Sequence, residues 1–345
     1  FGIDDLPYGI SAAGALLSYL EDTQKCDLNH LTSLKRHAFE KTMLLDEATV
    51  ANLELFESQS GFRKHTLFHI LNHTCTPMGS RLFRQWLRQP LLDAEEINQR
   101  YDSVEEFRNN FMLCEKFRQS LEFIQDLPRI MGRITLPVAG VNDLIALRES
   151  LEPLQILPVY FSELNSTLLE EVSEKFDPLT DLLDLLNQKL KEVPSLKLTE
   201  GGYIADGVSE ELDHLRDISR NSKEYLNQML QRERELTGIT SLKISYNKVF
   251  GYFLEVSNAH KSSVPENYIR KQTLVNAERY ITADLKEFEE KILSAEERIG
   301  ELEYELFQQL KIELNSNTLR VQKTAQDIAV ADTLAGLAHV AEHNH

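Results

Sequence analysis

The 345-residue sequence has few cysteines and no long apolar run. Its three cysteines, Cys26, Cys75 and Cys114, lie far apart and form no CxxC pair, which argues against a disulfide framework and a zinc module. No run approaches the roughly 18 apolar residues that a membrane span needs. The opening FGIDDLPYGI lacks the basic segment and apolar core of a signal peptide. A reduced, cytoplasmic protein with no membrane association is the simplest interpretation.

The sequence also lacks the motifs of several common catalytic sites. It contains no GxxxxGK[ST] loop to hold nucleotide phosphates, no GxGxxG after a strand, and no GxSxG nucleophile turn. Carboxylates are abundant, but almost all fall on helical faces that we expect to be solvated. We therefore expect this chain alone to catalyse nothing and to hold no cofactor.

Histidines recur every fourth residue in KHTLFHILNH, at His65, His69 and His73. Two histidines at i, i+4 can bind zinc, but a catalytic site also needs a third ligand and usually the glutamate of HExxH, which is absent between them. A metal-dependent hydrolase is therefore the least favoured hypothesis. The C-terminal histidines are no more indicative: His339, His343 and His345.

Negative charge predominates, with a formal net charge of −18. Phosphate binding needs local lysine and arginine, so any binding to nucleic acid must be confined to one patch. Residues 241–282 carry six basic and three acidic residues, a net charge of +3, whereas residues 283–312 carry four basic and nine acidic residues, a net charge of −5. The positive charge is therefore segregated into the first of these segments.

Apolar spacing predicts a mainly α-helical chain with one small β-rich insert. A long helix is expected over residues 208–236, with Val208, Leu212, Leu215, Leu226, Met229 and Leu236 on one stripe. A second is expected after Thr282, with apolar residues at alternating spacings of three and four: Leu285, Phe288, Ile292, Ala295, Ile299, Leu302 and Leu306. Between them, SLKISYNKVFGYFLEVS and QTLVNAERYI alternate as strands do. We therefore expect an antiparallel helical arm with the insert at its tip.

The insert contains the candidate phosphate contacts. They are basic or short hydrogen-bonding side chains, which suit contacts to phosphate without reading of bases. The candidates are Asn247, Lys248, Asn258, His260, Lys261, Arg270, Lys271 and Asn276. A β surface of ordinary mixed charge is the alternative interpretation.

A second basic feature lies on a helix expected to begin at Thr76 and Pro77, because a threonine oxygen can cap a helix that has proline at its first position. Arg81, Arg84 and Arg88 form a stripe along one of its faces. We favour the solvated face of a packed helix, and a phosphate contact is the alternative.

Four segments closely resemble, in the same order, segments of the bacterial MutS family of DNA mismatch-recognition proteins. They are NHTCTPMGSRLFRQWLRQPL, LKISYNKVFGYFLEVSNAH, NYIRKQTLVNAERYITADLKEFEEKIL and ADTLAGLAHVAE. The opening PYGISAAGALLSYLEDTQK is similar to the end of that family's connector domain. The resemblance covers essentially the whole chain.

The resemblance implies a helical core with long antiparallel lever helices that carry a small β-rich clamp. Residues 1–22 would end the connector, residues 23–237 would form the core and descending lever, residues 238–282 the clamp, and residues 283–345 the ascending lever and core helices that lead to an ATPase domain. The clamp would contact the backbone of double-stranded DNA non-specifically, and the levers would couple that contact to the ATPase. The alternative is a structural coiled-coil arm whose β tip binds a protein partner.

Two motifs of the family lie outside the segments that this sequence resembles: the N-terminal Phe-x-Glu motif that reads mismatches and the C-terminal Walker A loop. We therefore expect the chain to be the middle part of a longer repair protein. For that protein the resemblance implies ATP and magnesium as cofactors. It also implies double-stranded DNA, a MutL-type repair protein and a second copy of itself as partners.

Overall fold

The computed structural model describes residues 7–24, 41–62, 64–247 and 251–343, without the side chain of Lys223. The chain divides into two compact units. Unit 1 comprises Phe1–Asp184 and Glu313–His345, and unit 2 comprises Leu185–Ile312. Three residues named above lie outside the described residues: Cys26, Lys248 and His345.

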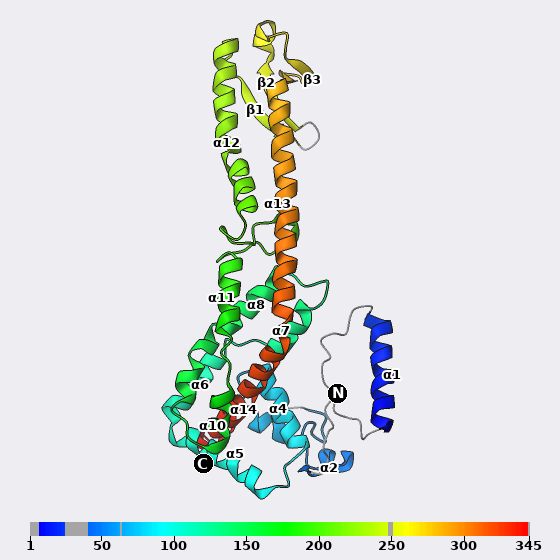
Figure 1. Ribbon diagram of the computed structural model, residues 1–345, viewed down its shortest axis with the longest axis vertical. Coiled ribbons are helices and arrows are strands. Elements are labelled where there is room, and N and C mark those ends of the chain that lie inside the picture. The colour runs from blue at the N-terminus through cyan, green and yellow to red at the C-terminus, as the bar shows by residue number, and fades with distance from the viewer. Residues whose placement is uncertain (1–6, 25–40, 63, 248–250, 344–345) are drawn as a thin grey trace. The chain divides into compact units, whose positions relative to one another are not determined.

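Unit 1 is built from helices (Figure 1). They are α1 (Pro7–Gln24), α2 (Glu47–Asn52), α3 (Leu67–Leu71), α4 (Pro77–Arg88), α5 (Ala94–Asn109), α6 (Phe111–Leu121), α7 (Leu127–Ile134), α8 (Val141–Leu151), the 3₁₀ turn η2 (Pro153–Gln155), α9 (Leu157–Phe161), α10 (Thr167–Lys175), α11 (Thr180–Lys189) and α14 (Thr318–His343). Helix α11 begins in unit 1 and ends in unit 2.

Helix α14 forms the centre of unit 1. It packs against α4, α5, α6 and α7, and its Ile328 and Leu334 are fully buried. The helix is rich in alanine, whose small side chain lets neighbouring helices approach on several sides. Consecutive residues 331–336 of this helix are all buried, so every side of α14 faces protein at this point.

A buried carboxylate fixes α14 to the start of α4. Asp332 accepts hydrogen bonds from the backbone N–H groups of Cys75 and Thr76, both at 2.8 Å, and from the Thr76 hydroxyl at 2.7 Å. The same hydroxyl accepts the N–H of Gly79 at 3.0 Å, which is the helix cap predicted from the sequence. One N-cap residue thus joins segments more than 250 positions apart in the chain.

Unit 2 contains two long helices and a small sheet. Its elements are η3 (Leu198–Glu200), α12 (Glu210–Thr237), β1 (Lys243–Asn247), β2 (Gly251–Ser257), η4 (Asn258–Ser263), β3 (Ile269–Thr273), β4 (Ala277–Ile281) and α13 (Ala283–Asn315), whose last residues belong to unit 1. The sheet is antiparallel with strand order β1-β2-β4-β3.

Side-chain contacts show that α12 and α13 run antiparallel. Near the start of α12, Glu211 pairs with Arg298 at 3.1 Å. Near its end, Arg232 pairs with Asp284 in the first turn of α13. Between these ion pairs the ring of Tyr225 of α12 stacks on the ring of Phe288 of α13, with 4.5 Å between the ring centroids. The helices therefore lie side by side within unit 2 (Figure 1).

The mainly α fold with a small β insert is confirmed. The long second helix begins after Thr282, whose hydroxyl accepts the N–H of Leu285 at 3.2 Å, and four of its seven expected seam residues are buried: Leu285, Ile292, Ala295 and Leu302. Leu236 was wrongly assigned to the buried stripe of the first helix, because it is 72% exposed. Its helix ends at Thr237 and is followed by Gly238, which has a left-handed backbone. No helix of the described residues is long and apolar enough to cross a membrane.

Candidate nucleic-acid interface

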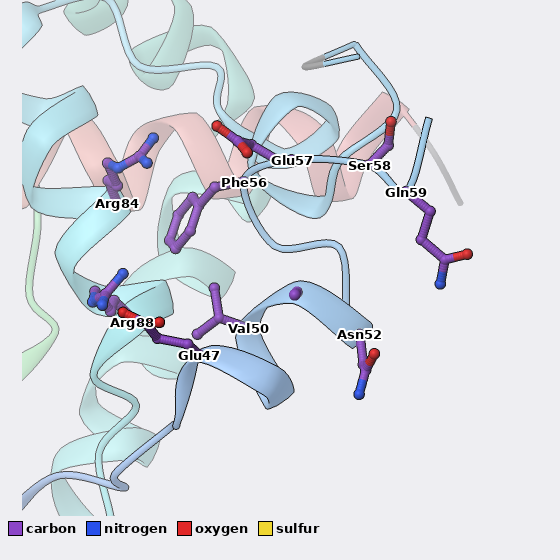
Figure 2. A pocket seen from close by; sticks show the side chains of 10 residues that line it. Glu47, Val50, Asn52, Phe56, Glu57, Ser58, Gln59, Arg84 and Arg88 are labelled. Carbon is purple, nitrogen blue, oxygen red and sulfur yellow. The ribbon is translucent and has the colours of Figure 1, made fainter. Parts of the chain in front are cut away.

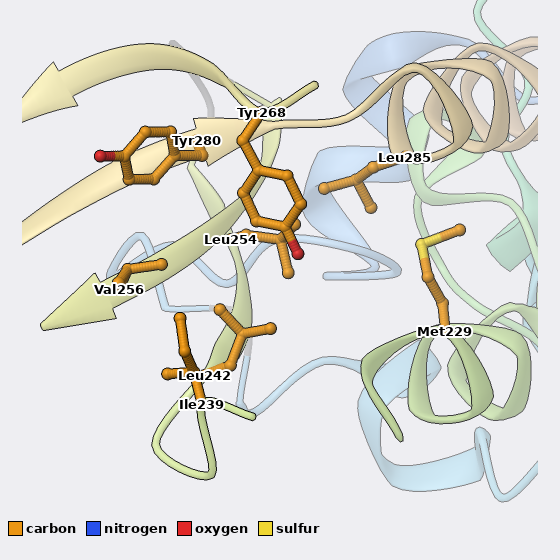
Figure 3. Packing of buried hydrophobic residues seen from close by; sticks show 8 residues of the cluster. All are labelled: Met229, Ile239, Leu242, Leu254, Val256, Tyr268, Tyr280 and Leu285. Atoms are coloured by element: carbon orange, nitrogen blue, oxygen red, sulfur yellow. The ribbon is translucent and has the colours of Figure 1, made fainter. Parts of the chain in front are cut away.

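The sheet of unit 2 packs on the adjoining ends of its two long helices (Figure 3). Leu254 of β2 and Tyr280 of β4 share a buried cluster with Met229 of α12 and Leu285 of α13. Ile239 and Leu242, in the segment between α12 and β1, and Val256 and Tyr268 complete it. The cluster fixes one face of the sheet against the helices, so the loops at its ends have defined positions.

The two ends of the sheet have different surroundings. At the start of β2, Gly251 lies against α13: a Cβ on Gly251 would come within 1.7 Å of Glu289 Oε1, and this carboxylate accepts the N–H of Tyr252 at 3.2 Å. Asn247 is paired with Gly251 and therefore lies at this end. At the other end of β2, Ser257 is paired with Ala277. The seven residues of β2 separate the two ends by roughly 20 Å.

The structure therefore divides the eight predicted phosphate contacts. Asn247 is half-buried at the α13 end of the sheet, and Lys248 lies outside the described residues. The other six lie on η4, on β3 or in the turn between β3 and β4, and we call them the distal cluster: Asn258, His260, Lys261, Arg270, Lys271 and Asn276.

Backbone contacts join the two loops of the distal cluster. The backbone N–H of Asn258 donates to the carbonyl of Asn276 at 3.2 Å. The side-chain amide of Asn258 donates to the carbonyl of Val275 at 2.9 Å. The segment η4 is therefore tied directly to the turn between β3 and β4, and the short polar side chains of both loops lie at one end of the sheet.

Two cations of the distal cluster share one buried carboxylate. Lys261 Nζ lies 2.6 Å from Glu278 Oε1, and Arg270 Nη1 lies 3.5 Å from the same oxygen. The hydroxyl of Tyr280 donates to Glu278 Oε2. The Lys261 ammonium, followed by the Tyr280 hydroxyl, holds the pKa of Glu278 below its ordinary value, so that this carboxyl is ionised at neutral pH.

Lys271 occupies an irregular position of β3. Arg270 pairs with Tyr280, but Gln272 pairs with Arg279, so the register shifts between Arg270 and Gln272. Bulges of this kind redirect side chains and increase the local twist. Lys271 is exposed at this point, which makes its ammonium accessible to a large anion.

The opposite face of the sheet holds a separate arginine. Arg279 lies over the ring of Phe253 at 4.3 Å, 3.5 Å from Glu255 and 2.8 Å from the side-chain oxygen of Gln272. Residues 253, 255 and 279 alternate with the buried cluster residues along their strands, so they face the other way. This arginine is therefore not part of the distal cluster.

In the sequence, Glu278 counted only as a negative charge of the insert. Its position in β4 already carried a signal, because residues 278 and 280 share one face of a strand, and Tyr280 belongs to the buried cluster. Glu233 of α12 is a second buried carboxylate, and it accepts the hydroxyl of Tyr268 at 2.7 Å. Both carboxylates are buried, so they are exceptions to the expectation that almost all carboxylates are solvated.

The arginine stripe of α4 is divided among different neighbours. Arg81 makes two hydrogen bonds to Asp126, at 2.5 and 2.9 Å, and Arg84 lies over the ring of Phe56 at 4.1 Å. Arg84 and Arg88 line an open cavity of about 530 Å³ (Figure 2). Glu47 also lines this cavity, so an acidic side chain lies near the arginines.

The three histidines spaced four residues apart, His65, His69 and His73, do not share a helix face. Helix α3 contains only His69, because His65 precedes its N-cap and His73 follows its C-cap. His73 lies 5.5 Å, between ring centroids, from His339 of α14. Burial, followed by the charge of His339, lowers the pKa of His73. Within the described ranges no group of three side chains is arranged to hold a metal ion.

Comparison with known proteins places the chain in a family. Residues 48–338 match the family model described as MutS domain III. Proteins named DNA mismatch repair protein MutS from Lachnoclostridium phytofermentans and Caldicellulosiruptor saccharolyticus are 42% and 45% identical over 99% and 96% of this chain. A protein of the same name from Methanosarcina mazei is 41% identical over 100% of it.

These matches cover only part of the longer relatives. The chain spans 37% of the length of the first relative and 39% of each of the other two. Each match nevertheless includes nearly all of this chain, and the family model covers most of its length. The chain belongs to the MutS family of DNA mismatch-repair proteins.

Proposed function

We propose that unit 2 contacts the backbone of double-stranded DNA through the distal cluster, without preference for sequence or for a mismatch. One observation supports this most directly: Lys261 and Arg270 converge on Glu278, the second residue of β4, next to the two asparagine-bearing loops. Cations and short amide side chains are typical of contacts to phosphate. Membership in the MutS family supports the choice of DNA as the partner.

The negative charge of the chain is compatible with this function because it is segregated. The distal cluster is basic, whereas residues 283–312, which form most of α13, carry a net charge of −5. A DNA duplex would be repelled by the helices and attracted to the end of the sheet. Electrostatics would thus select the orientation in which the two molecules meet.

We further propose that residues 238–282 act as a clamp on DNA, and that residues 23–237 and 283–345 provide core and levers. In the longer protein, an ATPase that uses ATP and magnesium would respond to DNA bound by this clamp. Two copies of the chain on one duplex would bind more tightly than one, because the second contact benefits from a high effective concentration. A MutL-type protein would act on the resulting complex.

A protein-binding tip is the alternative function. In the described part of the insert, the large exposed apolar side chains are Tyr246 on β1, Ile269 on β3 and Val275 in the turn between β3 and β4, which are 52%, 62% and 91% exposed. Tyr246 and Ile269 lie on opposite edges of the sheet, and Val275 lies at the other end of β3 from Ile269, so the three residues do not form one patch. The arrangement favours a charged partner over an apolar one.

The test is binding of this chain to a labelled duplex over a series of salt concentrations. The triple variant Lys261→Ala, Arg270→Ala, Lys271→Ala should bind perfect and mismatched duplexes more weakly by the same factor. The slope of log K against log salt should flatten by about 0.9 for each phosphate that the variant no longer neutralises. Lys271→Ala alone should flatten it by about 0.9.

Arg298→Ala is the matched control, since it removes a cation of α13 that pairs with Glu211 away from the sheet. It should leave affinity and slope unchanged. An unchanged affinity and slope in both the triple variant and Lys271→Ala would disprove the proposed contact surface. If binding of the chain to the duplex does not weaken with salt, phosphate contacts are not involved, and the protein-binding alternative is favoured instead.

A further inference from the structure

We propose that Glu278 is an internal counter-ion that competes with DNA phosphate for Lys261 and Arg270, and so limits the affinity of the distal cluster for DNA. This inference rests on the proposed function, because it concerns the same cations. Glu278 would thereby set how much uncompensated positive charge Lys261 and Arg270 offer to a ligand.

Burial differs sharply between the carboxylate and its cations. The side chain of Glu278 is 2% exposed, whereas those of Lys261 and Arg270 are 55% and 57% exposed. The carboxylate therefore lies behind the cations, out of reach of a large ligand. A phosphate approaching from solvent would meet the lysine and arginine while the glutamate stays in place beneath them.

Glu278 is held by its neighbours on both sides. The Tyr280 hydroxyl donates to one oxygen, while Lys261 and Arg270 lie near the other. A buried carboxylate is costly unless it is paired and hydrogen-bonded, so these three groups keep it ionised in place. The backbone contact between Asn258 and Asn276 fixes η4, which carries Lys261, against the same end of the sheet.

The charge balance determines the expected effect on DNA binding. Two cations and one carboxylate leave a net charge of +1 for the triad of Lys261, Arg270 and Glu278. Removal of the carboxylate charge would leave +2 in the same geometry. One more neutralised phosphate makes the salt dependence of binding steeper by about 0.9 in log K against log salt.

Glu278→Gln is the direct test, because glutamine has nearly the same shape. Its amide oxygen can accept from Lys261, and its amide N–H can donate to the Tyr280 oxygen. We expect Glu278→Gln to bind a labelled duplex about tenfold more tightly at roughly 0.1 M salt, with a slope steeper by about 0.9. Perfect and mismatched duplexes should respond alike, since phosphate contacts carry no sequence information.

Glu255→Gln is the matched control. It removes the same charge from the same sheet, but Glu255 pairs with Arg279 on the opposite face. The proposal predicts a clearly smaller increase in affinity and a nearly unchanged slope. Equal effects of Glu255→Gln and Glu278→Gln would show that net charge alone matters, and would overturn the proposal.

A double variant keeps the test decisive if the single one does not fold. Glu278→Gln with Arg270→Gln retains a net charge of +1 in the triad and leaves no buried carboxylate. The proposal predicts the wild-type slope for this variant, because the removal of one negative and one positive charge cancels. A slope flatter by about 0.9 would mean that Glu278 does not compete with phosphate, and would refute the proposal.

Failure of this inference can be told apart from failure of the proposed function. If Lys271→Ala and the triple variant weaken binding while Glu278→Gln matches wild type, the cluster binds DNA and Glu278 has no role in it. If none of these variants changes binding, the proposed contact surface itself is wrong and the inference fails with it. Far-UV circular dichroism and thermal unfolding of each variant confirm that the fold is retained.

Discussion

Gly79 shows at the scale of one residue how a buried carboxylate constrains its neighbours. It lies in the first turn of α4, where a Cβ would come within 2.2 Å of Asp332 Oδ2 and 2.8 Å of Asp332 Cγ. The carboxylate cannot retreat easily, because it accepts three hydrogen bonds from Cys75 and Thr76. The absence of a side chain at position 79 therefore allows α4 and α14 to meet.

Alanine normally stabilises a helix relative to glycine, but at position 79 it should destabilise the protein. Gly79→Ala should lower the free energy of unfolding by about 1–3 kcal/mol, because the new methyl group overpacks the site. Gly132→Ala, in the exposed part of α7 with nothing within 4 Å of its Cβ, should instead raise it by about 0.5–1 kcal/mol. Urea denaturation measures both values, and stabilisation by Gly79→Ala would show that Asp332 is not held as described.

At the scale of elements, a buried ion pair connects the two long helices of unit 2. Arg216 of α12 pairs with Glu303 of α13, and their side chains are 8% and 1% exposed. Arg216 also reaches Asp206 at 2.6 Å, and Glu303 accepts the backbone N–H of Gly202 at 2.6 Å. The glycine-rich turn before α12 is thus held between both helices by charged side chains.

Loss of this pair should destabilise unit 2 strongly. Glu303→Gln leaves the positive charge of the buried Arg216 only partly compensated, which should cost about 3 kcal/mol of unfolding free energy. Glu301→Gln, two residues away, removes an exposed partner of Arg298 and should cost less than about 0.5 kcal/mol. Similar losses for both variants in urea denaturation would contradict the structural role of Glu303.

At the scale of the whole molecule, buried thiols and phenols set the response to alkaline pH. Burial raises the pKa of Cys75 and of Cys114 to about 12. Burial and the neighbouring Glu278 raise the pKa of Tyr280 to about 12 as well. In the unfolded chain a thiol ionises with a pKa near about 8.5. Between these values the unfolded state therefore binds fewer protons than the native state.

Stability should accordingly fall as pH rises above about 8.5, because the slope of unfolding free energy with pH follows the difference in bound protons. Between about pH 8 and 10 the thiols should contribute before the phenols do. The double variant Cys75→Ala, Cys114→Ala should show a flatter decline over this range in chemical denaturation. An equally steep decline in the variant would mean that these two thiols ionise normally in the native state.

The sequence by itself determined the elements of this protein and their order. Prolines, the caps at Thr76 and Thr282, and the change from helical to strand spacing near Gly238 are local signals, because each depends on residues close in the chain. The segregation of positive charge into the insert was equally visible. These signals sufficed for the fold class and for the segment that holds the candidate site.

Only the tertiary structure decided which charges are buried and with what they pair. Glu278, Glu303 and Asp332 were not distinguished from the many other acidic residues in the sequence, yet each is buried and bonded to groups contributed by other segments. The structure also separated Asn247 from the distal cluster. Strand spacing could place Glu278 on the same face as Tyr280. The groups that a carboxylate pairs with depend on which distant segments fold against it, and local spacing does not encode those segments.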